Sequence, residues 1–353
     1  MNRLDQKLAR IRAGKYTRSD FIVADAKDGD MGSGCTTPAP ARNPDGSAVP
    51  GPRRLQTYLD QIKAVVEQDV VDIMLMSASN MERMVQEGVF RESAIQPAIR
   101  ANEATDCWGG LRGGKYTHHR SRNFRTAKIP RVMHGMNSPA RGAPITGTDL
   151  GLYSLTFNND LDADMASLQA FAEFRDDAAE NDFRYFLEVF NPNAPVGLDP
   201  ADVPSFVNDH ILRALAGVMQ ADRPQFLKIP FNGPAAMEEL AGYDPSLIVG
   251  VLGGGAGTTR DTFELLFQAE KYGARLALFG RKINLADSPL DIVRFMREVA
   301  NGTIAPEEAV RAYHGTLQSA GIRPSRPLAD DNVITEAVLK QDKSIGYVHA
   351  VAA

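Results

Sequence analysis

The chain has 353 residues, of which 43% are hydrophobic and 24% are charged. These fractions are typical of a folded globular protein and argue against a fibrous chain or a long disordered region. The 39 Lys and Arg residues against 44 Asp and Glu give a net charge of −5, so the composition indicates no binding to nucleic acid or to an anionic membrane surface.

Two cysteines, Cys35 and Cys107, show no paired spacing, which argues against a disulfide framework, a zinc ribbon or an iron–sulfur cluster. Residues 1–16 contain basic side chains but no apolar core of the kind that a secretion signal carries. No segment approaches the roughly 20 apolar residues that span a bilayer. We therefore expect a reduced protein of the cytoplasm with no membrane partner.

Short apolar runs alternate with helix-length amphipathic stretches from residue 21 onward, which predicts repeated βα units and a parallel sheet. Eight runs are predicted strands: 21–25, 70–76, 95–100, 152–157, 184–190, 225–229, 247–252 and 275–280. Residues 129–135 are an alternative third strand, but 95–100 is preferred because a helix over about 80–88 fits before it. The prediction is an α/β fold, one (β/α)₈ TIM barrel over residues 1–353.

Four segments lie outside this repeat. We expect an N-terminal helix within 1–20 and a C-terminal helical extension over 285–353, with one helix from about Pro306 to Ala320. Residues 32–53 are dense in Gly, Pro and Ser and predict a long loop after the first strand, and residues 101–150 predict another after the third. Both loops fall on the face where barrels keep their active sites, so they are expected to shape a substrate pocket or a subunit contact.

One charged side chain stands inside the apolar strand 225–229. Because side chains alternate across a strand, Leu227 and Ile229 are expected to pack against helices while Phe226 and Lys228 point into the barrel. Burial disfavours a charged ammonium group and leaves a lysine amine able to attack a carbonyl carbon. Lys228 is therefore the candidate covalent nucleophile. The alternative is a structural lysine that pairs with a carboxylate in the lumen.

The preceding strand, 184–190, repeats this pattern. Leu187 and Val189 share one face, which leaves Glu188 on the lumenal side and within reach of Lys228 in a closed barrel. A carboxylate there can hold the lysine in place or move protons during carbinolamine formation and carbon–carbon cleavage. Glu188 is the second candidate catalytic residue, with a purely ion-pairing role as the alternative.

Ionisable groups also gather near the ends of the first and third predicted strands. Asp25 ends the first strand and is the third candidate for chemistry, while the neighbouring Asp28 and Asp30 are interpreted as loop charges. Lys27 and Arg100 are candidate substrate-binding or phosphate-binding cations at this rim.

A glycine-rich loop follows the seventh predicted strand. Gly253, Gly254 and Gly255 come between an apolar strand and a helix, so backbone N–H groups can face an anion there. Gly280 and Arg281 end the next strand, where the guanidinium group can contact phosphate in bidentate fashion. Barrels often bind phosphate with the loops after strands seven and eight, so these five residues form the predicted phosphate site.

Cofactor sites find little support in the sequence. The glycine run lacks a clean G-x-G-x-x-G pattern and follows six strands, which disfavours a dinucleotide site. The six histidines are scattered, so we expect no metal and no other cofactor. The adjacent His118 and His119 begin an arginine-rich segment, 118–125, that is expected to meet solvent, a substrate anion or a partner subunit.

The segments FLEV, FLKIP, the GGG loop and FGRKIN, within residues 150–285, resemble the bacterial and archaeal class I aldolases that act on fructose bisphosphate, tagatose bisphosphate and sulfofructose phosphate. The resemblance implies that Lys228 is the Schiff-base lysine and Glu188 the carboxylate of the fifth strand. It also implies a phosphate site at Gly254, Gly255, Gly280 and Arg281, and a homo-oligomer. The first strand departs from the family pattern, because it reads ADAKDGDMG, and the 101–150 loop is longer than expected.

These patterns predict a metal-independent class I aldolase, a lyase that cleaves or forms a carbon–carbon bond in a phosphorylated ketose or related keto compound through a lysine Schiff base. Tyr153, on the fourth strand, is a possible proton donor, with a packed core tyrosine as the alternative. Other functions remain open. They are a lysine-dependent, thiolase-like acyl transferase, and a phosphate-binding barrel that acts as an isomerase or a non-catalytic metabolite-binding protein.

Overall fold

The computed structural model describes residues 2–40, 43, 45, 47, 49–194 and 197–341. Eight parallel strands form one sheet in the hydrogen-bonded order β8-β7-β6-β3-β2-β1-β10-β9. They are β1 (Ile22–Lys27), β2 (Ile73–Met76), β3 (Gln96–Arg100), β6 (Leu150–Thr156), β7 (Arg184–Phe190), β8 (Leu227–Lys228), β9 (Gly250–Leu252) and β10 (Leu276–Phe279). Backbone hydrogen bonds from Leu227 N to Ile248 O (2.8 Å) and from Leu252 N to Ile229 O (2.9 Å) bring β8 and β9 together and close the ring.

The predicted (β/α)₈ barrel is confirmed, and each of the eight predicted strands overlaps an observed one. Residues 129–135, the alternative third strand, instead form the short helix α5 (Ile129–His134), which ends at Gly135 with φ 73°. Pro130 in the first turn and a left-handed glycine after the last turn are ordinary start and stop features of a helix.

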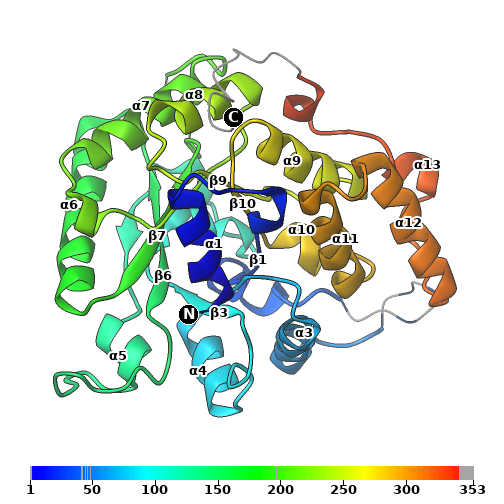
Figure 1. Ribbon diagram of the computed structural model, residues 1–353, viewed down its shortest axis with the longest axis horizontal. Helices are drawn as coiled ribbons and strands as arrows, with labels where there is room; N and C mark the ends of the chain where they lie inside the picture. The colour runs from blue at the N-terminus through cyan, green and yellow to red at the C-terminus, as the bar shows by residue number, and fades with distance from the viewer. Residues whose placement is uncertain are drawn as a thin grey trace.

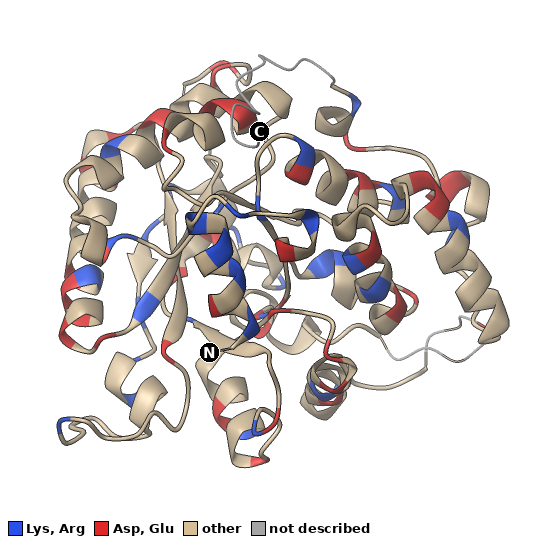
Figure 2. Ribbon diagram, in the orientation of Figure 1, with Lys and Arg blue, Asp and Glu red and all other residues tan. Residues whose placement is uncertain are grey.

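Helices surround the strands, as Figure 1 shows. Those between the strands and after the last one are α3 (Leu55–Gln68), α4 (Ala78–Gln86), α6 (Leu161–Glu180), α7 (Val203–Ala216), α8 (Pro234–Tyr243), α9 (Thr259–Lys271), α10 (Arg281–Asn284), α11 (Pro289–Asn301), α12 (Pro306–Ser319) and α13 (Leu328–Asp331). Lys, Arg, Asp and Glu are interspersed over these helices, with neither sign of charge dominating the face in Figure 2. Within the described residues, no helix is both long enough and apolar enough to cross a membrane.

Alternation along the strands divides the apolar core into two layers. Leu187 and Leu227 belong to the outer layer, where the strands meet the helices, while Phe186 and Phe226 stack at 4.6 Å in the inner layer. The inner layer also contains small and branched side chains from the strands, among them Ile22, Ala98 and Leu152, so the lower part of the barrel is a packed core.

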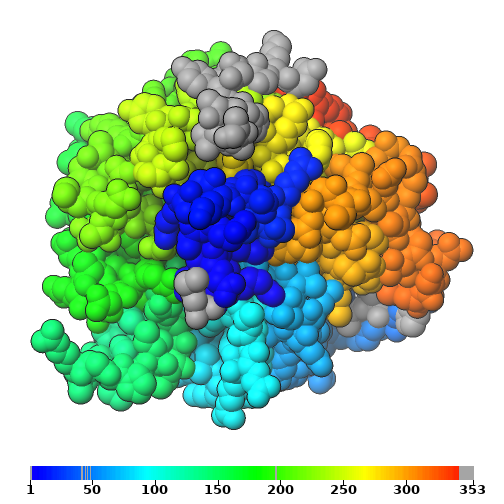
Figure 3. Space-filling view, in the orientation of Figure 1, coloured from blue at the N-terminus to red at the C-terminus, as the bar shows by residue number. Residues whose placement is uncertain are grey.

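The helix α1 (Arg3–Arg12) seals the amino end of the barrel. Leu4 and Leu8 are buried and pack with the inner layer. Figure 1 shows α1 in front of the strands, and in Figure 3 the N-terminal residues cover the centre of this face. Lys7 pairs with Asp72 at 2.9 Å, which ties the helix to the loop before β2. The carboxyl ends of the strands therefore carry the side of the barrel that is left for a ligand.

The two long loops meet over those carboxyl ends. After β3 the chain forms a short antiparallel pair of two-residue strands, β4 (Glu103–Ala104) and β5 (Asn123–Phe124), and a 3₁₀ helix at Thr105–Gly110 follows β4. This 3₁₀ helix packs against α2 (Asp30–Ser33), which follows β1. The contact is close: a Cβ atom added to Gly32 would lie 2.4 Å from the carbonyl oxygen of Cys107, so only glycine allows it.

Candidate active site

Lys228 and Glu188 meet in the barrel lumen. The parallel register pairs Glu188 with Lys228 across β7 and β8, and it pairs Ser154 with Glu188 across β6 and β7. The Lys228 Nζ atom lies 2.6 Å from Glu188 Oε1, and both side chains are almost fully buried. Ser154 Oγ donates a hydrogen bond of 2.7 Å to Glu188 Oε2. The structure thus brings the predicted lysine and carboxylate together on adjacent strands.

Arg100 completes this group from β3. Its guanidinium donates to Glu188 Oε2 at 3.0 Å, to Ser154 Oγ at 2.6 Å and to Asp28 Oδ2 at 2.6 Å. Asp28, in the loop after β1, was interpreted from the sequence as a loop charge, and its side chain is only 11% exposed. Two cations and two carboxylates therefore balance one another in a site from which water is largely excluded, which makes each contact electrostatically strong.

The charges of this group set the protonation of its carboxylates. Burial alone would raise the pKa of Glu188, but the charges of Lys228 and Arg100, together with hydrogen bonds from Lys228 and Ser154, hold it below its usual value. The pKa of Asp28 is lowered in the same way, because the charges of Arg100 and Lys228 outweigh its burial. Both carboxylates are ionised at neutral pH. The charge of Arg100 is therefore paired with Glu188 and Asp28 of the protein itself.

Asp25 and Lys27 lie on the opposite face of β1 from this group. In the register Asp25 pairs with Met74 and Phe279, which belong to the outer layer between strands and helices. The Lys27 Nζ atom lies 3.5 Å from Asp25 Oδ2, and both side chains are fully buried. Burial, opposed by Lys27, raises the pKa of Asp25 to about 6. The structure therefore does not bring Asp25 and Lys27 to the lumenal group around Lys228.

The glycine-rich loop (residues 253–257) leads from β9 to α9. Gly254 has φ 65°, and a Cβ added to Gly254 or Gly255 would meet no atom within 4 Å, so open space lies above both residues. Gly280 packs against β1, since a Cβ there would lie 2.8 Å from the carbonyl oxygen of Ala26, and Arg281 begins α10 with an exposed side chain. The loop after β9 and the end of β10 are neighbours, since a Cβ added to Gly253 would lie 3.1 Å from the Phe279 ring. The phosphate site stays a prediction.

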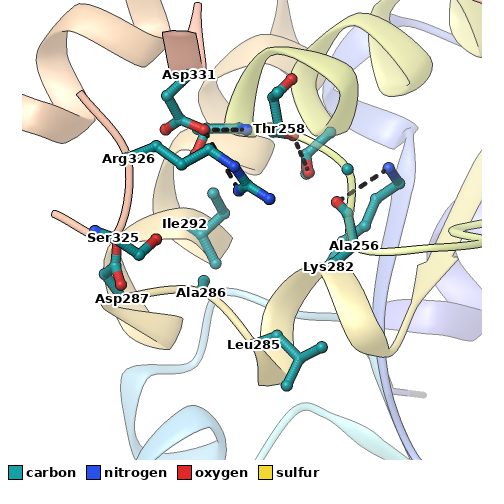
Figure 4. A pocket seen from close by; sticks show the side chains of 13 residues that line it. Ala256, Thr258, Lys282, Leu285, Ala286, Asp287, Ile292, Ser325, Arg326 and Asp331 are labelled. Carbon is teal, nitrogen blue, oxygen red and sulfur yellow. Dashed lines mark hydrogen bonds and ion pairs between the residues drawn. The ribbon is translucent and has the colours of Figure 1, made fainter. Parts of the chain in front are cut away.

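The N-terminus of α9 itself is occupied by protein carboxylates. Thr258 and Asp261 form a capping box, and Asp331 Oδ1 accepts a hydrogen bond of 2.9 Å from Thr259 N. Figure 4 shows Asp331 and Arg326 on one side of a small pocket here, and Lys282 on the other. The pocket has a volume of about 40 Å³, which suits ordered water and is too small for a sugar phosphate.

A larger, basic pocket opens on the 101–150 segment. Its volume is about 610 Å³, within the usual range for small-molecule sites. It is lined by Thr105, Tyr116, His118, His119, Arg120, Arg122 and Ala194. Asn193, just beyond β7, holds the pocket's backbone by donating to Thr117 O (3.1 Å) and His119 O (2.7 Å). The arginine-rich segment predicted from the sequence therefore lies beyond the carboxyl end of the strand that carries Glu188.

Tyr153, the possible proton donor, packs outward in a stack with Phe174 at 4.4 Å, in agreement with the alternative of a packed core tyrosine.

Four further residues lie in the lumen. Ser154 and Thr156 occupy the lumenal positions at the carboxyl end of β6, which strand alternation could have revealed. Asp106 and Cys107 enter from the 3₁₀ helix after β4, where no sequence pattern indicates them.

No protein-family model matches the chain, and no curated protein matches its sequence. Solved structures do share the fold. An archaeal fructose 1,6-bisphosphate aldolase is similar with a TM-score of 0.58 and 13% identity, over 85% of this chain and 99% of that one. The fructose-bisphosphate aldolase from Slackia heliotrinireducens is similar with a TM-score of 0.61 and 12% identity, over 89% and 91% of the two chains. An archaeal aldolase with its catalytic lysine bound to the substrate's carbinolamine intermediate gives a TM-score of 0.57 and 12% identity, over 84% and 99%. These likenesses show the barrel fold.

Proposed function

We propose that this chain is a class I aldolase in which Lys228 forms a Schiff base with the carbonyl carbon of a phosphorylated ketose or related keto compound. One observation carries the proposal: a lysine buried in the lumen of a (β/α)₈ barrel, with its Nζ atom 2.6 Å from the carboxylate of Glu188. The shared fold with an aldolase whose lysine is bound to a carbinolamine supports the same reaction class.

The contacts around Lys228 suggest how the amine becomes reactive. As a carbonyl compound enters, the ammonium group passes a proton to Glu188 Oε1, and the neutral amine attacks the carbonyl carbon. The attack leaves a negative charge on the oxygen and a positive charge on the nitrogen. Glu188 returns its proton to the oxygen and then passes a second proton from the nitrogen to it, so the oxygen leaves as water and the iminium ion remains. Arg100 and Ser154 hold Glu188 Oε2 throughout, so the carboxylate changes protonation without changing position.

The iminium ion then serves as the electron sink for carbon–carbon cleavage. The bonding electrons of the broken bond form a new C=C bond, and the π electrons of the C=N bond move onto nitrogen, which gives an enamine. A hydroxyl group on the departing fragment becomes its carbonyl as it loses a proton. A phosphate on the retained fragment is assigned to the N–H groups of Gly253, Gly254, Gly255 and Gly280 and to Arg281.

A second function has one observation in its favour. The Lys228 ammonium is already neutralised by Glu188, an arrangement that also suits a barrel that binds a phosphorylated metabolite without covalent chemistry. Such a protein would keep the glycine-rich loop and use the ion pair only to stabilise the lumen.

Borohydride trapping separates the two functions. The chain is incubated with dihydroxyacetone phosphate, and separately with ketose phosphates, then reduced and digested for peptide mass spectrometry. The aldolase gives a reduced adduct on Lys228, and the Lys228→Arg variant gives none. Lys63→Arg, at a half-buried lysine of α3 that pairs with Glu87, is the matched control and is expected to be trapped like the parent. Phosphate-compound binding without any adduct would support the non-covalent function.

A further inference from the structure

The proposed cleavage leaves one proton transfer without a residue. Both oxygens of Glu188 are committed at the nitrogen, because Oε1 faces Lys228 and Oε2 accepts hydrogen bonds from Arg100 and Ser154. Tyr153 points away from the lumen. The remaining lumenal side chains of β6, Ser154 and Thr156, carry hydroxyl groups that are far too weakly acidic to exchange protons at neutral pH. The proton of the substrate hydroxyl therefore needs another acceptor.

Asp106 reaches the lumen from the 3₁₀ helix after β4. Its Oδ2 atom accepts a hydrogen bond from the Thr156 hydroxyl group. Thr156 lies two residues beyond Ser154 on the same face of β6, a rise of roughly 7 Å. Asp106 therefore meets β6 nearer the carboxyl ends of the strands than the level at which Glu188 pairs with Ser154. A substrate joined to Lys228 must extend in that direction, because α1 and the inner core layer close the other end.

The second oxygen of Asp106 is unoccupied by the protein. Asp106 Oδ1 is buried and has no hydrogen-bond partner among the residues that the structure describes. A buried carboxyl oxygen without a partner costs free energy unless a ligand supplies one. One oxygen held by Thr156 and the other free is the arrangement that a group needs to meet a substrate hydroxyl in a fixed orientation.

The surroundings of Asp106 also suit a proton carrier. Burial raises the pKa of Asp106 above its usual value and the charge of Glu188 adds to this, while the hydrogen bond from Thr156 and the nearby Ser121 hydroxyl group oppose the rise. The segment is braced on both sides: Thr105 N donates to Arg122 O at 3.1 Å, and Ser121 N donates to Asn158 Oδ1 at 2.8 Å. The acid is thus held by the inserted loop against the end of β6.

We propose that Asp106 is the catalytic acid–base for carbon–carbon cleavage, an inference that rests on the proposed Schiff-base function. Ionised Asp106 takes the proton of the substrate hydroxyl as that oxygen becomes the carbonyl of the departing fragment. The electrons of the broken carbon–carbon bond form the enamine on Lys228. Asp106 then gives the proton to the enamine carbon, which restores the iminium ion for hydrolysis, so atoms and charge balance over the cycle.

The test compares Asp106→Asn with the parent on the ketose phosphate that the parent cleaves fastest among fructose 1,6-bisphosphate, tagatose 1,6-bisphosphate and sulfofructose 1-phosphate. We expect kcat to fall by about 10²–10⁴ with KM within about threefold, because acid–base catalysis contributes that much to the rate. Borohydride trapping of dihydroxyacetone phosphate on Lys228 should stay within about twofold of the parent, since Schiff-base formation uses Glu188.

Two further variants distinguish a catalytic role from a structural one. Asp106→Glu, which keeps the acid, should recover part of kcat and shift the pH profile of kcat, while Asp209→Asn, at an exposed carboxylate of α7, should behave like the parent. Cleavage by Asp106→Asn at close to the parent rate overturns the assignment, and so does a parallel loss of trapping and cleavage. A parent chain that is neither trapped nor active on the panel overturns the Schiff-base function itself.

Discussion

Arg100 Nη2 donates to Glu188 Oε2 at 3.0 Å although a whole strand, β6, separates the strands that carry the two residues. The same guanidinium reaches Asp28, so it neutralises two carboxylates at once. Arg100→Met would leave both carboxylates buried with one cation, Lys228, between them. The variant is expected to lose about 3–5 kcal/mol of unfolding free energy in urea denaturation.

The control for this prediction is an exposed arginine. Arg311 pairs with Glu307 on the surface of α12, and both side chains are more than half exposed. Arg311→Met should lose less than about 1 kcal/mol, since exposed ion pairs are screened by water. Equal losses of unfolding free energy in the two variants would mean that the buried ion pairs of Arg100 stabilise the fold no more than an exposed ion pair does.

Asp25 gives the fold a pH dependence with a definite sign. Burial raises the pKa of this carboxyl to about 6, whereas an unfolded aspartate titrates near 4. From about pH 4 to 6 the folded chain keeps a proton that the unfolded chain has released, so the contribution of Asp25 to stability declines as pH rises through that window. Asp25→Asn cannot titrate, and the difference in unfolding free energy between parent and variant should change across the window and level off above it. A difference that stays constant from pH 4 to 7 would contradict the prediction.

Glu188→Gln tests the proton transfer from Lys228. The amide keeps the shape and can still contact Arg100 poorly, but it cannot accept the ammonium proton 2.6 Å away. The rate of borohydride-trapped adduct formation on Lys228 is expected to fall by about 10²–10⁴ in a quench-flow time course. Glu87→Gln, which removes an exposed partner of Lys63, should leave that rate unchanged. An unaltered rate in Glu188→Gln would assign the deprotonation to another group.

The glycine-rich loop offers a matched pair of alanine variants. Gly255 has open space above its Cα and an ordinary φ, whereas Gly254 has φ 65°. Gly255→Ala should keep its thermal stability and raise KM for a phosphorylated substrate by about tenfold, because a methyl group stands where the anion approaches. Gly254→Ala should in addition lose about 1–2 kcal/mol of stability through left-handed strain. An unchanged KM in Gly255→Ala would mean that the phosphate binds elsewhere. The basic pocket at 118–122 would then be the next site to mutate.

The meeting of Lys228 and Glu188 was predictable because two simple rules suffice for it. Alternation of side chains along β7 and β8 places Glu188 and Lys228 on the lumenal face, away from the helices. Consecutive strands of a barrel are neighbours, so the two side chains meet. The eight strands followed from the same apolar runs. These features are local in the sequence, and the structure preserves them in β7 and β8.

Asp25 shows why alternation alone does not assign a face. Strand β1 is buried along its whole length, so apolar residues occupy both of its faces and their pattern does not distinguish the lumen from the helix layer. The register with β2 and β10 decides it, and a register is set by neighbours that lie about 50 and 250 residues away. Asp106 was less predictable still, because it follows a strand of only two residues, β4, and so short a strand carries no periodicity.

Leu4 and Leu8 close the amino end of the barrel, so its lumen opens only at the carboxyl ends of the strands. Whatever reacts at the bottom must enter and depart past the same rim, where the segments after β1 and β3 touch through Gly32. In the proposed cleavage both fragments use this opening. The free fragment leaves first, because the other stays bound to Lys228 until hydrolysis. A larger side chain at Gly32 would push the two loops apart and widen this opening. The release rate of the products would then change together with the affinity for the substrate.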